Sequence, residues 1–188
     1  MHPVILSTAY LPNLQYLKQV IDANELMIET KEHYVKQTQR NRCEILSSTG
    51  AMRLSIPLVQ KSDKEIICDK RISYAEKWQH QHWRSITTAY KSAPYFEFFE
   101  HEFKPFYENK HEFLVDYNTE LLKTMLHILR IKKTIQLSSE YNEHISMNNA
   151  SIFLKPYYQV FDYKLGFTPK LSCIDALFNV GLDTLLLL

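Results

Sequence analysis

The chain has 188 residues, 45% of them hydrophobic, so that a single core, in one domain over residues 1–188, is able to bury about 70% of the unfolded surface. The 22 Lys and Arg residues nearly balance the 21 Asp and Glu residues, and the net charge of +1 excludes nucleic acid and anionic membranes as partners that the overall field would attract. Three cysteines fit no disulfide framework, and the first residues hold neither a basic leader nor a long apolar run, so we expect a cytoplasmic protein without a membrane anchor.

The first thirty residues predict a β-α-β unit. Residues 4–7 are a short apolar run typical of a buried strand. Residues 11–23 repeat apolar side chains at helical spacing, and residues 25–29 are apolar again. A strand, a helix and a second strand in this order are typical of a parallel pair with a crossover helix.

The next segments predict further strands. Residues 43–46 and 52–58 flank a Ser-Ser-Thr-Gly sequence, which indicates a hairpin. A third strand is expected over residues 65–72, after a polar loop. We therefore predict an α/β fold in which the β-α-β unit and the hairpin form a mixed sheet, packed by helices from the C-terminal half.

The second half predicts those helices. From residue 75 to Pro94, apolar positions recur at three and four residues, and a short aromatic helix follows until Pro105 interrupts it. Residues 113–131 carry the longest amphipathic stripe and are expected to pack on the sheet.

The end of the chain is less regular. Residues 136–154 are rich in Ser, Asn and Glu, which favours an irregular surface segment, with a lid as one interpretation. Ser172 and Asp175 fit a capping box that opens a short helix, and Gly181 is placed to end it.

The densest group of polar side chains, at residues 34–43, is the best candidate for a binding site. Lys36, Arg40 and Arg42 supply cations suited to phosphate or carboxylate, and Gln37 and Asn41 are suited to reading a polar ligand. The alternative is a solvated turn whose arginines pair with surface carboxylates.

Three other residues are candidates for the site. His82 lies on an apolar helical stripe, where burial would lower its proton affinity, so it is either a general base or a core histidine with one hydrogen bond. Tyr10 follows the first strand, at the edge of the sheet where α/β proteins bind ligands, but a rigid turn explains it equally well. Asn179 either binds substrate or helps to end its helix.

The sequence predicts neither a metal nor a cofactor. His80 and His82 would project about 200° apart on a helix, so they do not chelate one ion. With only three glycines the chain lacks a glycine-rich phosphate cradle. Cys43 beside Arg42 is a candidate thiolate, but a small buried strand residue is the simpler interpretation.

Six segments in one order resemble the WbqC-like protein family, and together they span most of the chain. They are Ala9-Tyr10-Leu11-Pro12 with Tyr16; Tyr34, Lys36 and Asn41-Arg42; Leu54-Ser55-Ile56-Pro57; Trp78 and His82 with Ala93-Pro94-Tyr95-Phe96; Tyr158-Gln159-Val160-Phe161; and residues 169–179. The resemblance implies a bacterial protein associated with O-antigen, capsule or other surface-glycan pathways, in a family without an established reaction.

Residues and resemblance together give two hypotheses. In the first, the protein binds an anionic or amino-sugar metabolite, such as a nucleotide sugar, and acts as a transferase on it in surface polysaccharide synthesis. Lys36, Arg40 and Arg42 would then hold the anionic group, Gln37 and Asn41 would read hydroxyls, and His82 would remove a proton. In the second, it is a non-catalytic assembly protein that forms a homo-oligomer through the aromatic run at residues 96–106.

Overall fold

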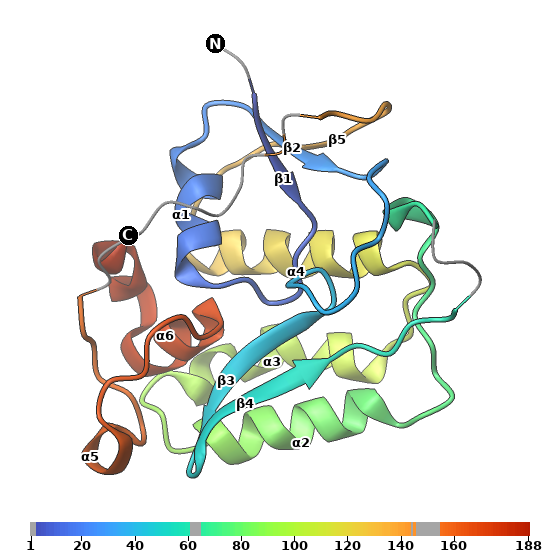
Figure 1. The fold of residues 1–188 in the computed structure, drawn as a ribbon. Coiled ribbons are helices and arrows are strands. Elements are labelled where there is room, and N and C mark those ends of the chain that lie inside the picture. Colours follow the sequence, from blue (N-terminus) through green and yellow to red (C-terminus); the bar gives the residue numbers. More distant parts are fainter. Residues whose placement is uncertain (1–2, 61–64, 144, 146–154) are drawn as a thin grey trace.

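The computed structural model describes residues 3–60, 65–143, 145 and 155–188. Three parallel strands form one sheet in the order β1-β2-β5, with β1 at Val4–Ser7, β2 at Leu26–Glu29 and β5 at Ile135–Leu137. Helix α1, Leu14–Asp22, connects β1 to β2, so the predicted β-α-β unit is confirmed. The fold is a single α/β domain, as the sequence predicted (Figure 1).

The start of α1 differs from the prediction of a helix from residue 11. Leu11 has a positive φ of 40°, which a helix does not tolerate. Asn13 instead caps the helix, because its side chain accepts a hydrogen bond of 2.9 Å from the Tyr16 N–H. The segment between β1 and α1 is therefore a turn.

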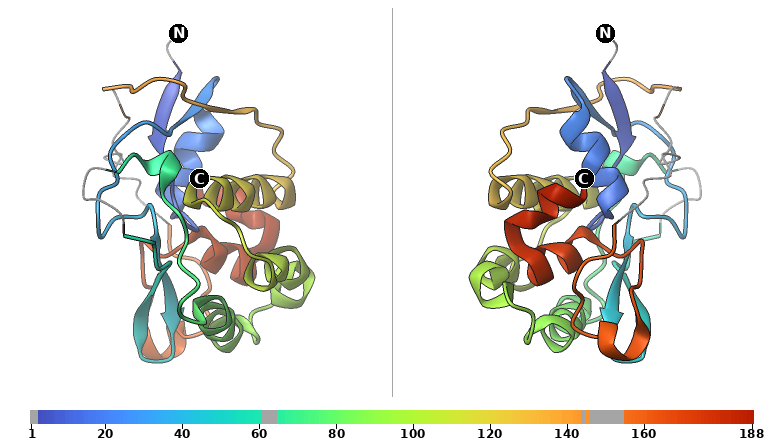
Figure 2. Two further views of the ribbon diagram at one scale, coloured as in Figure 1. Left: turned by 90° about the vertical axis from the view of Figure 1, so that its right-hand side faces the viewer. Right: turned by 90° about the vertical axis from the view of Figure 1, so that its left-hand side faces the viewer.

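The predicted hairpin is confirmed, but it forms a separate two-stranded sheet and does not join the β-α-β unit in the predicted mixed sheet. Strands β3, Arg42–Ser47, and β4, Gly50–Ser55, pair antiparallel, with Arg42 opposite Ser55 in the last pair. Figure 2 shows the hairpin beside the short helix α5, Asp162–Leu165, at the end of the molecule away from the parallel sheet. A 3.0 Å hydrogen bond from Lys164 Nζ to the Ser48 carbonyl joins the two.

The predicted strand at residues 65–72 is wrong. The segment contains a 3₁₀ turn, Ile67–Asp69, with isolated bridges on either side. Ile67 is fully buried, but the N–H groups of Ile67 and Cys68 bond to the Glu32 and Thr30 carbonyls, 2.9 and 3.1 Å away, rather than to a neighbouring strand. These contacts satisfy the backbone without a ladder, so an apolar pattern alone was misleading here.

Helices α2 (Trp78–Tyr90), α3 (Phe96–Glu108) and α4 (Leu114–Ile128) supply a large share of the core. Figure 1 shows α4 between the parallel sheet and the α2–α3 pair. Pro105 does not interrupt α3, contrary to the prediction. The proline is exposed near the end of the helix, so the His101 carbonyl that loses its partner also lies on the exposed side and water can satisfy it.

The C-terminal segment comprises α6 (Cys173–Val180) and a 3₁₀ helix (Gly181–Leu187). Ser172 caps α6 and Gly181 ends it, as predicted. A Cβ at position 181 would lie 2.7 Å from the Tyr95 ring. Gly181 also has a left-handed φ of 62°, so both the close contact and the backbone conformation require glycine here. Asp175 does not close a capping box, because its carboxylate is used by a buried network described below.

The segment predicted as irregular contains β5 at its start. Ser138, directly after that strand, is buried and donates a 2.9 Å hydrogen bond to Glu29, whose carboxylate also accepts two bonds from Asn142. Burial would raise the pKa of Glu29, but these donors and the Lys31 N–H together lower it below its usual value. Most of the proposed lid, at residues 144 and 146–154, lies outside the described residues.

No helix in the described part of the chain is long and apolar enough to cross a membrane.

Candidate functional site

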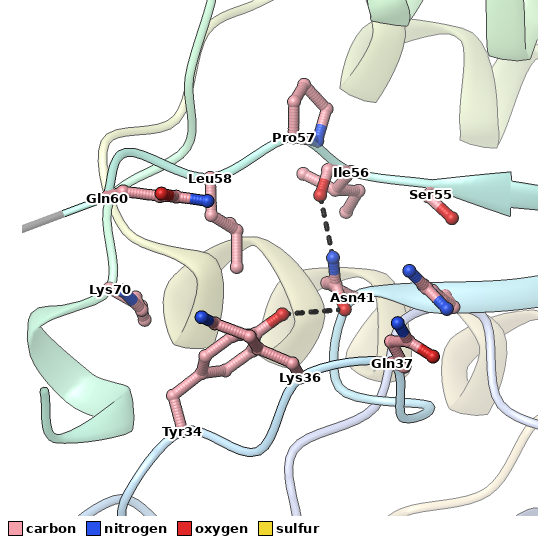
Figure 3. Close-up of a pocket in the computed structure, with 11 residues that line it drawn as sticks. Tyr34, Lys36, Gln37, Asn41, Ser55, Ile56, Pro57, Leu58, Gln60 and Lys70 are labelled. Atoms are coloured by element: carbon pink, nitrogen blue, oxygen red, sulfur yellow. Dashed lines mark hydrogen bonds between the residues drawn. The ribbon is translucent and has the colours of Figure 1, made fainter. Parts of the chain in front are cut away.

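A pocket of about 600 Å³ lies where residues 34–42, residues 55–60 and Lys70 meet. The first segment connects β2 to β3, and the second continues from β4 (Figure 3). Four of the predicted binding residues line it: Lys36, Gln37, Asn41 and Arg42. The densest polar segment of the sequence therefore forms one wall of a pocket large enough for a metabolite.

The pocket is positively charged. Lys36, Arg42 and Lys70 line it, and none of its described lining residues is a carboxylate. Lys70 is already used, because its Nζ lies 2.6 Å from Glu65 Oε2 in a pair whose side chains are only 5% and 10% exposed. That Nζ also lies 5.2 Å from the centre of the Tyr34 ring.

Arg42 is available to a ligand. Its Nε is buried without a hydrogen-bond partner, and within the described residues its guanidinium has no ion pair. Because Arg42 opposes Ser55 across the β3–β4 ladder, both side chains project from the same face of the hairpin, and both line the pocket. A guanidinium and a hydroxyl are thereby placed side by side, which is a suitable donor set for an oxyanion.

Asn41 holds two walls of the pocket together. Its Nδ2 donates to the Ile56 carbonyl at 2.8 Å, and its Oδ1 accepts from the Tyr34 hydroxyl at 3.0 Å (Figure 3). The Ile56 N–H returns a 2.8 Å bond to the Asn41 carbonyl. With both ends of the amide used, Asn41 shapes the pocket, and its predicted contact with a ligand stays a prediction.

Gln37 lines the pocket from a strained position, with a φ of 63°. The left-handed region costs most non-glycine residues about 1 to 2 kcal/mol. Arg40 holds the turn that follows: its guanidinium pairs with Glu32 through two nitrogens and donates to Thr38 Oγ1 at 3.1 Å and Ser7 Oγ at 3.0 Å. Arg40 does not line the pocket, so its predicted contact with an anion also stays a prediction.

Tyr10 and His82 contact each other in the interior of the protein. The Tyr10 hydroxyl lies 2.9 Å from His82 Nδ1 and 3.0 Å from the Tyr107 hydroxyl, and both Tyr10 and His82 are buried. Burial lowers the pKa of His82 to about 4, although a hydrogen bond with the Ser55 backbone acts in the opposite direction. The imidazole is therefore neutral at pH 7. Neither residue lines the pocket, and the catalytic role of His82 stays a prediction.

Asn179 lies elsewhere, in α6, and is buried. Its Nδ2 donates to the Asp175 carbonyl at 2.7 Å, as expected for a residue one turn further along a helix. Beside it, the fully buried Asp175 carboxylate accepts hydrogen bonds from Tyr90 at 2.9 Å, Tyr157 at 2.8 Å and Gln159 at 2.8 Å. Burial raises the pKa of Asp175, and the three donors oppose that rise.

The sequence missed several lining residues. Ser55 had a usable signal, because pairing outward from the Ser-Ser-Thr-Gly turn places it opposite Arg42. Lys70 and Gln60 had none, since they reach the pocket through long-range folding. No group of three potential metal ligands occurs among the residues that the structure describes.

Comparison with known proteins identifies the family. The model of the WbqC-like protein family matches residues 8–153. The chain is 24% identical over 216 residues to the "Uncharacterized protein Rv1507c" of Mycobacterium tuberculosis (strain ATCC 25618 / H37Rv), covering 95% of this chain and 94% of that protein. No solved structure matches the chain. The family match spans well over half of the sequence, and the chain belongs to the WbqC-like protein family.

Proposed function

We propose that the pocket binds an anionic small molecule, with a phosphate or carboxylate against Arg42 and Lys36. The observation that carries this proposal is that Arg42 lines the pocket while its guanidinium has no ion pair within the described residues. A guanidinium without a carboxylate partner is suited to a ligand phosphate or carboxylate, which it holds through charge-assisted hydrogen bonds. Asp and Glu are absent from the described lining, so no protein carboxylate competes for the place of the anion.

The size of the pocket favours a metabolite. A volume of about 600 Å³ is typical of small-molecule sites. Ile56, Pro57 and Leu58 give it an apolar side, while the cations and carboxamides give it polar groups that would fix the orientation of a ligand. A nucleotide sugar or an amino-sugar metabolite combines such features.

The enzymatic form of the proposal is the transfer of a group onto the bound sugar during surface polysaccharide synthesis. It rests on the surface-glycan association that the family resemblance implies, not on a catalytic group in the pocket. Binding without turnover is the other form. Incubation with sugar nucleotides and acyl donors, followed by mass spectrometry of the small molecules, distinguishes them, because only transfer changes a mass.

A thermal-shift screen tests the binding step. Nucleotide sugars, amino sugars, sugar phosphates and nucleotides are the probes, and a ligand at about 100 times its dissociation constant stabilises by about 2.7 kcal/mol. We expect a shift with one anionic class, lost in Arg42→Gln. The matched control is Arg53→Gln, since Arg53 lies on the same hairpin, outside the pocket, in an exposed pair with Glu44. No shift with any anion, or equal loss in both variants, would contradict the proposal.

The second candidate function is assembly through the aromatic run. Phe98 is 67% exposed and its ring lies 6.1 Å from that of the exposed Tyr95, which favours a contact surface here. However, Phe96, Phe103 and Tyr107 belong to the core, so much of the run is already used inside the protein. Light scattering of wild type and Phe98→Ser tests it: a dimer lost in the variant supports assembly, and a wild-type monomer at high concentration contradicts it.

A further inference from the structure

Gln37 occupies a position that glycine would adopt freely. Its φ of 63° is left-handed, its side chain is exposed, and it lines the pocket. A turn needed only to connect β2 to β3 gains nothing from a long side chain here. A strained residue at a pocket wall is instead typical of a functional constraint.

The carboxamide of Gln37 is available to a ligand. Within the described residues it has no hydrogen-bond partner, and the same is true of Gln60. Figure 3 shows these two side chains at opposite sides of the pocket, with Asn41 and Lys36 between them. A carboxamide both donates and accepts, whereas the guanidinium and ammonium groups only donate. The two glutamines therefore suit neutral groups of a ligand, such as hydroxyls or amides, rather than its charge.

The turn that carries Gln37 is held rigidly. Arg40, three residues later, pairs with Glu32, whose side chain is 6% exposed, and the Arg40 carbonyl accepts a 2.8 Å hydrogen bond from Asn118 Nδ2. The Gln39 carbonyl accepts a 2.9 Å bond from the Tyr10 N–H. These contacts hold the Gln37 backbone in place before a ligand arrives, so little ordering is needed on binding.

We propose that Gln37 is a specificity-determining residue that recognises a hydroxyl or amide of a sugar whose phosphate lies against Arg42. The inference rests on the proposed anion pocket and adds the residue that would recognise the neutral, sugar part of the ligand. Arg42 and Lys36 then supply affinity for the phosphate, and Gln37 distinguishes a sugar phosphate from a bare phosphate. Loss of the carboxamide removes one or two neutral hydrogen bonds and leaves the charge contacts intact.

The test compares two probes, inorganic phosphate and glucose-1-phosphate, by calorimetric titration of wild type, Gln37→Gly and Arg42→Gln. Lys170→Gly is the matched control, because Lys170 has a φ of 65°, is exposed and lies outside the pocket. Both glycine variants should unfold at a higher temperature, since each relieves a left-handed residue. Wild type and Lys170→Gly should prefer the sugar phosphate by about tenfold, and Gln37→Gly should lose most of that preference while it binds phosphate as wild type does.

The outcomes separate the two claims. The role of Gln37 is overturned if Gln37→Gly keeps the full preference, if it binds both probes equally more weakly, or if wild type has no preference. In each of these cases the anion pocket still stands if phosphate binding depends on Arg42. Failure of wild type to bind either probe would overturn both. Glycine variants that unfold at unchanged temperature would remove the strain argument for Gln37.

Discussion

The pocket and the Asp175 network are both rich in polar groups, yet they differ in how those groups are satisfied. The Asp175 carboxylate is fully buried and receives three hydrogen bonds from Tyr90, Tyr157 and Gln159. In the pocket, the Arg42 guanidinium has no ion pair with any residue that the structure describes. A satisfied network holds segments together, whereas an unsatisfied donor beside a cavity is available to a ligand. Substitutions in the Asp175 network should therefore lower stability, whereas substitutions in the pocket should weaken ligand binding with little effect on stability.

The largest effect on stability is expected in the network. Asp175→Ala removes the shared acceptor of three hydrogen bonds, two of them from buried side chains, and should reduce the free energy of unfolding by about 3 to 5 kcal/mol. Urea denaturation measures this loss. Asp183→Ala, at an exposed position in the following 3₁₀ helix, is the control and should stay within about 0.5 kcal/mol of wild type. A loss below about 1 kcal/mol for Asp175→Ala would show that the network contributes little to the stability of the fold.

The next effect depends on pH. The pKa of His82 is lowered to about 4 in the folded protein, from 6.5, so the unfolded chain takes up the proton first as the pH falls. The contribution of His82 is fully present above about pH 6.5 and is lost as the pH falls towards 4, by about 3 kcal/mol in all. Urea denaturation across this range should show that His82→Gln removes this part of the pH dependence. An unchanged slope in the variant would contradict a buried neutral His82.

A smaller effect connects charge pairing with binding. Glu65→Gln removes the charge that pairs with the buried Lys70 but keeps an amide acceptor, and should cost about 2 kcal/mol without ligand. The same change leaves the charge of Lys70 without a carboxylate at the pocket, so an anion should bind more tightly and restore part of the lost stability. Urea denaturation without phosphate measures the loss of stability, and urea denaturation with saturating phosphate measures how much of it binding restores. Weaker phosphate binding in Glu65→Gln would contradict the electrostatic account of the pocket.

The smallest effect is expected at Ser55. Its hydroxyl lies in the pocket opposite Arg42, and Ser55→Ala should weaken anion binding by about 0.5 to 1.5 kcal/mol while the free energy of unfolding stays within about 0.5 kcal/mol. Calorimetric titration gives the first value and urea denaturation the second. Ser48→Ala, in the exposed turn of the same hairpin, is the control. Equal affinity in wild type and Ser55→Ala would remove the hydroxyl from the site.

Local patterns in the sequence predicted what local forces decide. The β-α-β unit, the hairpin and the apolar stripes of α2 and α4 follow from periodicity and turn chemistry, and the structure confirms them. The segment at residues 65–72 has an apolar pattern but turns, because Glu32 and Thr30 supply its backbone acceptors. Such contacts between segments distant in the sequence cannot be predicted from the local residue pattern. Strand β5 was missed for the same reason, since three residues beside β2 carry little periodicity.

The same limit applies to the site. The density of cations and amides at residues 34–43 correctly marked a segment that lines a pocket, but it did not say which side chains are free. Arg40 and Arg42 have the same chemistry in the sequence, but in the fold Arg40 pairs with Glu32 and donates to Thr38 and Ser7, whereas Arg42 has no ion pair within the described residues. His82 was placed on an apolar stripe, but its bond to Tyr10, 72 residues away in sequence, was not predictable.

The most direct test of the central claim is to measure binding and stability in the same Arg42→Gln protein. The anion identified by thermal shift is titrated by calorimetry, and the free energy of unfolding is measured in urea. If Arg42 binds the anion, Arg42→Gln should weaken anion binding by at least about tenfold, because a charge-assisted hydrogen bond is lost. The free energy of unfolding should change by less than about 1 kcal/mol. Unchanged affinity, or a loss of stability as large as that of Asp175→Ala, would contradict the account and place Arg42 among the structural residues.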